Sequence, residues 1–398
     1  MTKHSEHSIS RGARTITIYQ IIAFVVPWNT AFKASRVLNT LYALHLGATP
    51  WETGLLLSMY GLFPMVFAAY AGRIIDRHGV RMPLYLGLTW LFIGVGLPFV
   101  WPSFAAIYVS AAVGGAGFIL SQVSMQTLTG SLADGEARTR NFSYYLLAVA
   151  TADLIGPVLA GFAIDAYGHA STFAICAVPT LISIAGFLAM DRLFPRVQGP
   201  GKETVVQGVF SVLREKELRR VLMTSAVTMT AADLFQLYVP LYAHSVGLTA
   251  SVIGLVMGAA AVAIFVTRAL LPPMTRLLSE ERLLMFALLL TGAMFALIPL
   301  FRSGIALGLI CFVLGLGLGL CQPLTMILSF NRSPKGRAGE VVGVRVTINN
   351  FMHVVVPPVF GAAASITGLA PVLWASAGVL SLGAYMSRLR PVIKVEAP

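Results

Sequence analysis

Twelve long apolar stretches divide the chain, and they limit the possible folds more than any other feature of the sequence. A helix needs about 20 mostly apolar residues to cross the hydrocarbon core of a bilayer. Each stretch approaches or exceeds this length and ends at a turn or at a cluster of charged residues. We therefore expect an all-α integral membrane protein. The expected spans are 16–43, 53–72, 82–99, 103–131, 141–164, 170–190, 219–243, 251–271, 283–300, 303–330, 341–363 and 370–387.

The composition excludes a water-soluble fold. Of the 398 residues, 57% are apolar and only 11% are charged, whereas soluble domains carry roughly 25% charged residues. The net charge of +12 does not indicate a nucleic-acid partner, because the basic residues interrupt apolar runs instead of forming a patch or stripe. The three cysteines lie within apolar stretches, so we expect neither a disulfide framework nor a metal site.

The basic residues also predict the orientation, because cytoplasmic loops of membrane proteins are enriched in Lys and Arg. With the N-terminus in the cytoplasm, 24 of the 28 Lys and Arg residues fall in cytoplasmic segments. Only Arg302 falls in an outer loop, and Lys33, Arg36 and Arg345 fall within spans. We expect a multi-pass protein of the inner (cytoplasmic) membrane with both termini in the cytoplasm.

An internal repeat divides the chain into two halves. Residues 41–55 align with residues 241–255 at an offset of 200, and 7 of these 15 positions are identical. Transporters are often built from such repeats, with the solute site between them. Residues 204–218 carry apolar side chains on one face, so this part of the linker forms either a helix on the membrane surface or a flexible connection. The expected units are an N-terminal bundle (1–190), a cytoplasmic linker (191–218) and a C-terminal bundle (219–398).

Two short motifs resemble those of the major facilitator superfamily. Residues 72–81 (GRIIDRHGVR) are similar to its motif A, and residues 156–161 (GPVLAG) are similar to its motif C, a pattern associated with antiporters. The resemblance implies two pseudo-symmetric six-helix bundles and a motif A latch in which Asp76 lies near the start of the eleventh helix. Ser110 and Ala111 stand where the arginine of motif B is expected, which departs from the family pattern. The conformational residues implied are Gly72, Asp76, Arg77, Gly79 and Arg81 in motif A, and Gly156, Pro157, Ala160 and Gly161 in motif C.

Few ionisable residues lie deep within the spans, and a charge there costs at least about 2.5–3.5 kcal/mol, so these residues are functional candidates. The candidates for proton coupling or an ion pair are Lys33, Arg36, Asp153 and Asp233. The repeat aligns Lys33 with Asp233, so we expect these two side chains to face each other across the cavity. Either Asp233 or Asp153 then carries the coupling proton; the alternative for Asp233 is a structural ion pair that locks the outer gate.

Neutral polar and aromatic side chains supply a second class of candidates. Amides and hydroxyls can bind a solute by hydrogen bonds without the cost of buried charge, and aromatic rings add an apolar wall. This mixture suits an amphipathic organic molecule better than a sugar or a bare ion. The candidate cavity residues are Trp28, Asn29, Gln122, Gln126, Gln236, Gln322, Thr325, Asn349 and His353.

These features favour a secondary transporter that works by alternating access, with the proton as coupling ion and no other cofactor. The chain has no G-x-x-x-x-G-K-[ST] loop, so ATP is not the expected energy source. We expect a monomer in the bilayer that exports a small organic solute. One alternative is an importer or uncoupled facilitator of an organic anion, such as a siderophore or a carboxylate, bound by Lys33, Arg36 and Arg345. A remote alternative is a membrane enzyme, which would need a cluster of His and acidic residues near one interface.

Overall fold

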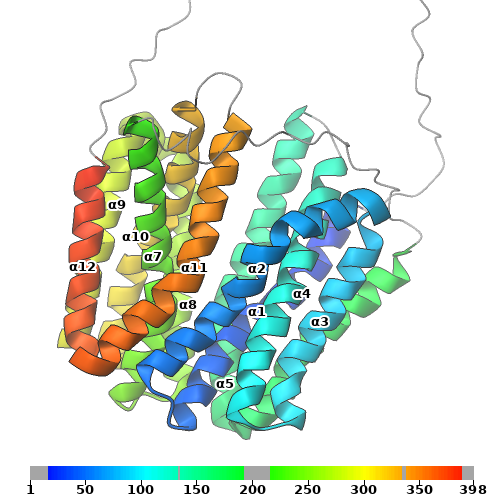
Figure 1. Ribbon diagram of the computed structural model, residues 1–398, viewed down its shortest axis with the longest axis horizontal. Helices are drawn as coiled ribbons and strands as arrows, with labels where there is room; N and C mark the ends of the chain where they lie inside the picture. Colours follow the sequence, from blue (N-terminus) through cyan, green and yellow to red (C-terminus); the bar gives the residue numbers. More distant parts are fainter. Residues whose placement is uncertain (1–16, 133–134, 192–215, 334–337, 388–398) are drawn as a thin grey trace, which may run out of the picture.

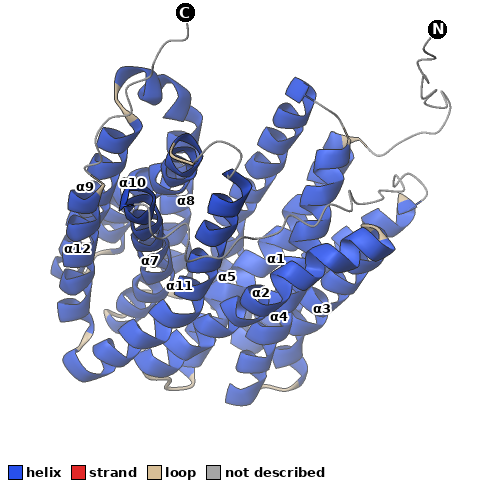
Figure 2. Ribbon diagram, turned by 45° about the horizontal axis from the view of Figure 1, so that its top comes forward, coloured by secondary structure: helices blue, strands red, loops and turns tan. Residues whose placement is uncertain are grey.

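The computed structural model describes residues 17–132, 135–191, 216–333 and 338–387, and every regular element in these ranges is a helix (Figures 1 and 2). The elements in chain order are α1 (Ile18–His45), α2 (Pro50–His78), α3 (Arg81–Val100), α4 (Phe104–Ser131), α5 (Gly135–Ala189), α7 (Lys216–Ser245), α8 (Ala250–Leu277), α9 (Glu280–Leu297), η2 (Ile298–Leu300), α10 (Gly304–Asn331), α11 (Ala338–Thr367) and α12 (Leu369–Met386).

Each of the twelve predicted spans lies on a helix, which confirms the all-α fold within the described residues. The helix α5 contains two spans, because Gly168 (φ 77°) breaks the helical backbone between them. Eight of the described helices, with α5 as one of them, are long and apolar enough to cross a membrane by composition alone. The helices α1, α2 and α7 are not among these eight. In α1 and α7 the polar residues proposed to act in transport lower the apolar character.

Several helices extend past the predicted span ends, because an apolar stretch stops at the first charge whereas the helix continues into the interface. The N-terminus of α2 shows how such an end is fixed. The backbone N–H of Thr49 donates to Oε2 of Glu52 at 2.8 Å, and the side chain of Thr49 accepts from the Glu52 N–H at 3.3 Å. This capping box satisfies backbone donors that have no partner within the helix. It starts α2 at Pro50, three residues before the predicted span.

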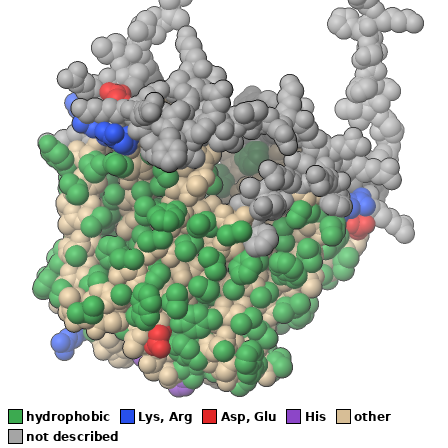
Figure 3. Space-filling view, viewed as in Figure 1, with side chains coloured by type: hydrophobic (Ala, Val, Ile, Leu, Met, Phe, Trp, Pro, Cys, Tyr) green, Lys and Arg blue, Asp and Glu red, His purple; other side chains and the backbone are tan. Residues whose placement is uncertain are grey.

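Exposed large apolar side chains occur on helices of both halves. On the face shown in Figure 3, hydrophobic side chains cover the middle, and Lys, Arg, Asp and Glu lie at the upper and lower edges. Cys176, Cys311 and Cys321 are buried and unpaired. Since no water is available in a bilayer core to bond exposed backbone, a helical bundle with an apolar belt is the arrangement that a membrane requires.

The helices form two halves. Within the first, α1 packs on α5 and α4 packs on both α2 and α3; within the second, α7 packs on α11, and α8, α9 and α10 pack together. The halves meet mainly where α2 packs on α11 and where α5 packs on α8 (Figure 1). The predicted repeat is visible in the backbone, because Gly47 and Gly247 have φ of 86° and 82°, and Gly168 and Gly368 have φ of 77° and 85°.

The two halves approach most closely at the end that carries the α1–α2 and α7–α8 turns. A Cβ atom at Gly54 of α2 would overlap the carbonyl of Pro357 in α11, and one at Gly254 of α8 would lie 2.5 Å from the carbonyl of Pro157 in α5. These two contacts are related by the 200-residue offset. Glycine at both positions therefore lets backbone touch backbone across the interface.

Hydrogen bonds between the halves reinforce the same end. The carboxylate of Asp165 in α5 accepts from the backbone N–H groups of Ala250 and Ser251 at 3.2 and 2.8 Å, which caps the N-terminus of α8. At the repeat-related position, Oγ of Ser365 in α11 accepts from the N–H of Trp51 in α2 at 3.0 Å. This end of the molecule is thus closed by paired helix caps, and from there the halves diverge toward the opposite end (Figure 1).

The close contacts make a testable prediction. Gly54→Ala and Gly254→Ala should each disfavour the closed end, because overpacking a tight contact costs about 1–3 kcal/mol. Spin labels at Leu46 and Ser245, on opposite halves at this end, should then show a new population at longer distance. The control is Gly308→Ala, since a Cβ at Gly308 meets nothing within 4 Å. Unchanged distance distributions in both variants would contradict the role given to these glycines.

Candidate functional site

The first charged pair in the bundle interior joins α1 to α5. The Nζ atom of Lys33 lies 2.6 Å from Oδ1 of Asp153, and the two side chains are 20% and 27% exposed. The backbones are close enough for this bridge because Gly156, one turn after Asp153, packs directly on α1: a Cβ at Gly156 would lie 2.6 Å from the Cβ of Lys33. The first glycine of motif C therefore allows the approach that brings Lys33 and Asp153 together.

The second pair joins α7 to α11. The Nδ1 atom of His353 lies 2.6 Å from Oδ1 of Asp233. The side chain of Asp233 is only 3% exposed, whereas that of His353 is 28% exposed. The second carboxylate oxygen, Oδ2 of Asp233, is buried and has no hydrogen-bond partner in the described part of the chain. The histidine is thus the more exposed member of the pair.

The prediction that Lys33 faces Asp233 is wrong, because each has a different partner. Both pairs nevertheless obey the repeat: Lys33 and Asp233 differ by 200 in number, and so do Asp153 and His353. The repeat has therefore kept two charge pairs at equivalent places and exchanged their polarity. In the first half the base is on the first helix of the pair, and in the second half the acid is.

Arg36 lies one turn beyond Lys33 on α1 and forms no ion pair with the described residues. Its guanidinium carbon lies 5.7 Å from the ring centroid of Tyr60 in α2, within the range of a cation–π contact. The Tyr60 hydroxyl accepts from Nδ2 of Asn39 at 2.6 Å and lies 3.2 Å from Oγ of Ser35. Sequence reasoning missed this network, although Asn39 and Tyr60 are polar residues within expected spans.

The predicted cavity residues divide into two groups. Gln122, Gln236 and His353 are partly exposed and Gln126 is exposed, so their side chains are accessible. Trp28, Asn29 and Thr325 are buried, so they do not line open space in this structure. The Trp28 ring packs on Phe118.

Among the polar candidates, Asn29 and Thr325 bond within their own helices, whereas Gln322 and Asn349 contact α7. The amide of Asn29 donates to the carbonyl of Val25 in its own helix, and Thr325 bonds carbonyls of its own helix. Nε2 of Gln322 lies 2.9 Å from Sδ of Met229, and Oδ1 of Asn349 accepts from Ser225 at 3.1 Å. These contacts join α10 and α11 to α7.

Arg345 and the motif A residues belong to neither of the two charge pairs. Arg345 is 7% exposed, and its Nε has no partner in the described part of the chain. Gly79 has φ of 75° at the turn between α2 and α3, and Arg81 pairs with Asp191 at 3.4 Å. The side chains of Asp76 and Arg77 are outside the described part, so the latch stays a prediction. Of the predicted linker (191–218), residues 192–215 are also outside the described part, and residues 216–218 form the start of α7.

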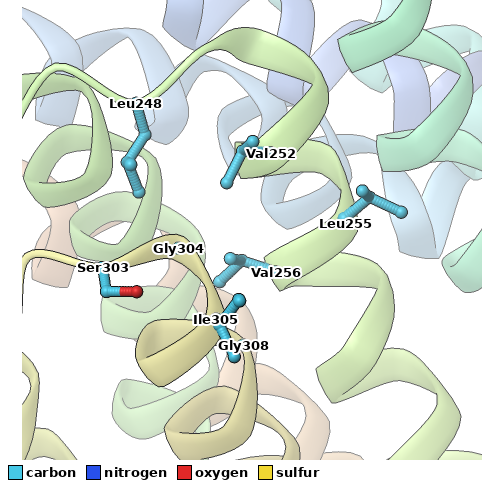
Figure 4. Close-up of a pocket in the computed structure, with 8 residues that line it drawn as sticks. All are labelled: Leu248, Val252, Leu255, Val256, Ser303, Gly304, Ile305 and Gly308. Atoms are coloured by element: carbon cyan, nitrogen blue, oxygen red, sulfur yellow. The ribbon is translucent and has the colours of Figure 1, made fainter.

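A separate apolar groove of about 410 Å³ lies between the first turns of α8 and α10 (Figure 4). It contains no charged side chain and none of the candidate residues. Since Leu255 and Ile305 are 50% and 80% exposed on the apolar outer surface, the groove faces the region expected to contact lipid. Its lining residues are Leu248, Val252, Leu255, Val256, Ser303, Gly304, Ile305 and Gly308.

Comparison with known proteins gives three consistent findings. A family model described as Major Facilitator Superfamily matches residues 16–357. The chain is 23% identical to Multidrug resistance protein 1 of Bacillus subtilis over 77% of this chain and 79% of that protein, and 23% identical to the class G Tetracycline resistance protein of Vibrio anguillarum over 87% and 90%. The crystal structure of the nucleoside transporter NupG superposes with a TM-score of 0.78 at 14% identity, covering 94% of this chain and 99% of that chain.

The first charge pair gives a test of the geometry. Lys33→Gln or Asp153→Asn should each lower the melting temperature in detergent, because a partly buried charge without its partner costs about 1–3 kcal/mol. Exchanging the two residues, Lys33→Asp with Asp153→Lys, should recover most of the loss. If the exchanged protein melts no higher than the single variants, the two side chains do not form the pair described.

Proposed function

Because the chain belongs to the major facilitator superfamily, it is a multi-pass membrane transporter and not an enzyme, and we propose that it exports a small amphipathic organic solute in exchange for protons. Its relatives include proteins named for resistance to multiple drugs and to tetracycline. The motif C sequence in α5 also favours exchange. We propose the cytoplasmic membrane as its location, with both termini in the cytoplasm.

The shape of the molecule supports alternating access. The end with the α1–α2 and α7–α8 turns is closed by the Gly54–Pro357 and Gly254–Pro157 contacts. With the proposed orientation, this closed end faces outward. A solute in the cytoplasm then enters between the diverging halves and reaches Lys33, Arg36 and His353, whose side chains are partly exposed.

The observation that carries the proton-coupling proposal is the contact between His353 and Asp233 within the bundle. Histidine is the side chain that ordinarily changes charge near neutral pH. With a proton on His353 the pair is neutral overall, and without it the buried Asp233 carboxylate has no positive partner. The Lys33–Asp153 pair contains no such group, so we assign the coupling proton to the C-terminal pair and a fixed role to Asp153.

The two states of the pair give a simple exchange cycle. When the outer end opens, a proton binds the pair and the solute leaves. When the inner end opens, the proton leaves, and the negative Asp233 attracts a solute with a cationic group. Lys33, Arg36 and Asp153 on α1 and α5 are the other charged side chains placed near the middle of the first half, and they keep the same charge through this cycle.

Transport assays test the proposal directly. In proteoliposomes with an imposed pH gradient, wild-type protein should accumulate an amphipathic zwitterion such as 3-(2-naphthyl)alanine. Asp233→Asn should reduce the accumulation at least tenfold, while exchange of labelled for unlabelled solute without a gradient continues at saturating solute. His353→Gln should flatten the pH dependence. The control His244→Gln changes an exposed histidine at the outer end of α7. Full gradient-driven accumulation by Asp233→Asn would contradict the assignment.

Labelling in intact cells tests the orientation. Gly199→Cys, in the linker, should not react with a membrane-impermeant maleimide added outside, whereas Leu46→Cys, exposed at the closed end, should react. The native cysteines give little background because all three are buried. The reverse labelling pattern would show that the closed end faces the cytoplasm.

A further inference from the structure

The exposed surface of α1 shows where a solute can contact this helix. Between residues 28 and 43 every residue is buried except Lys33 and Arg36, which are partly exposed. The helix packs on α2, α3, α4, α5 and α7, so other helices surround it. The accessible surface of these two side chains therefore opens on the space between the halves and not on lipid.

Of these two cations only Arg36 is available to a ligand. Lys33 is bound to Asp153, and the other deep acid, Asp233, is bound to His353. Arg36 has no carboxylate partner among the described residues, and its Nε has no hydrogen-bond partner there. An uncompensated charge within a transmembrane helix is costly, and such residues mark solute and ion pathways.

The surroundings of Arg36 hold it in place without neutralising it. Its guanidinium lies against the Tyr60 ring, and the Tyr60 hydroxyl is fixed by Asn39 and Ser35. Asn39 also donates to Oγ of Ser110 in α4 at 3.2 Å. All these partners are uncharged, so the network orients Arg36 and leaves its positive charge in place.

Among the described residues, a free cation at the position of Arg36 is present in only one of the two repeats. The position equivalent to Arg36 on α7 is Gln236, which is also partly exposed but neutral. We propose that Arg36 binds a carboxylate group of the transported solute, because its planar guanidinium can donate two parallel hydrogen bonds to a carboxylate. This proposal rests on the proposed transport function and names the class of solute.

The charge of the solute determines whether it moves with protons or in exchange for them. A solute with only a carboxylate binds better when the His353–Asp233 pair is protonated, because the negative charge of Asp233 is then compensated. Such a solute would move with protons and not against them. Exchange with protons therefore requires a second, cationic group on the solute, which is attracted by the negative charge of Asp233 when His353 has lost its proton. The exported solute is then an amphipathic zwitterion.

Equilibrium binding to purified protein in detergent tests the site with three probes that share one apolar ring system: 2-naphthoate, 2-naphthylmethylammonium and the zwitterion 3-(2-naphthyl)alanine. Wild-type protein should bind the two carboxylates, and Arg36→Gln should weaken both by at least tenfold while leaving the ammonium within threefold. Arg36→Lys, which keeps the charge, should fall between wild type and Arg36→Gln. Arg302→Gln, in an exposed loop, should match wild type.

Two results would overturn the carboxylate site: wild-type protein that binds neither carboxylate, or Arg36→Gln that binds them as tightly as wild type does. If Arg36→Gln does not fold, the same binding comparison is made with Arg36→Lys and Tyr60→Phe. The first variant removes the planar guanidinium and the second removes the hydroxyl that fixes the Tyr60 ring, so each should still weaken binding of the carboxylates more than binding of the ammonium. Because the assay uses no gradient, carboxylate binding without proton-driven flux would retain the site and refute only the exporter.

Discussion

The cost of an uncompensated charge in a membrane determines how the interior of this bundle is arranged. Two carboxylates lie near the middle of the described helices, and each has a basic partner at 2.6 Å: Lys33 for Asp153 and His353 for Asp233. At the first pair, Gly156 lets α5 pack directly on α1 beside Lys33. Arg36 differs from Lys33 in having no carboxylate partner among the described residues. It is a partly exposed cation held by neutral groups, and it is the residue to which we assign the solute.

The two repeats share backbone contacts and helix caps but differ in the side chains at equivalent positions. The close contacts of Gly54 with Pro357 and of Gly254 with Pro157 are equivalent in the two halves, as are the caps supplied by Asp165 and Ser365. The side chains at equivalent positions differ, however: a lysine–aspartate pair corresponds to an aspartate–histidine pair, and an arginine to a glutamine. We propose that one half responds to protons while the other keeps its charge, although the backbones of the two halves are arranged alike.

The sequence was sufficient to predict the twelve spans, the repeat and the small set of charges within the spans. The length of an apolar stretch, an alignment at an offset of 200 and the rarity of charge can all be read without knowing which helices pack together. It did not predict the partners. Lys33 and Asp233 are equivalent residues of the two halves, and equivalent residues meet only when they lie on the axis that relates the halves. Lys33 instead points to α5, on which α1 packs. The matching offset between Asp153 and His353 was a signal for the second pair, since partners of equivalent residues are themselves equivalent.

We infer that the two charge pairs are structural equivalents, and we propose that only the histidine-containing pair couples transport to protons. The most direct measurement gives the second half the pair of the first, with Asp233→Lys and His353→Asp in one protein, and compares its solute accumulation under a pH gradient with that of wild type. We expect a folded protein with a melting temperature near that of wild type, solute exchange without a gradient, and no accumulation driven by the gradient. Accumulation at the wild-type level by this variant would contradict it.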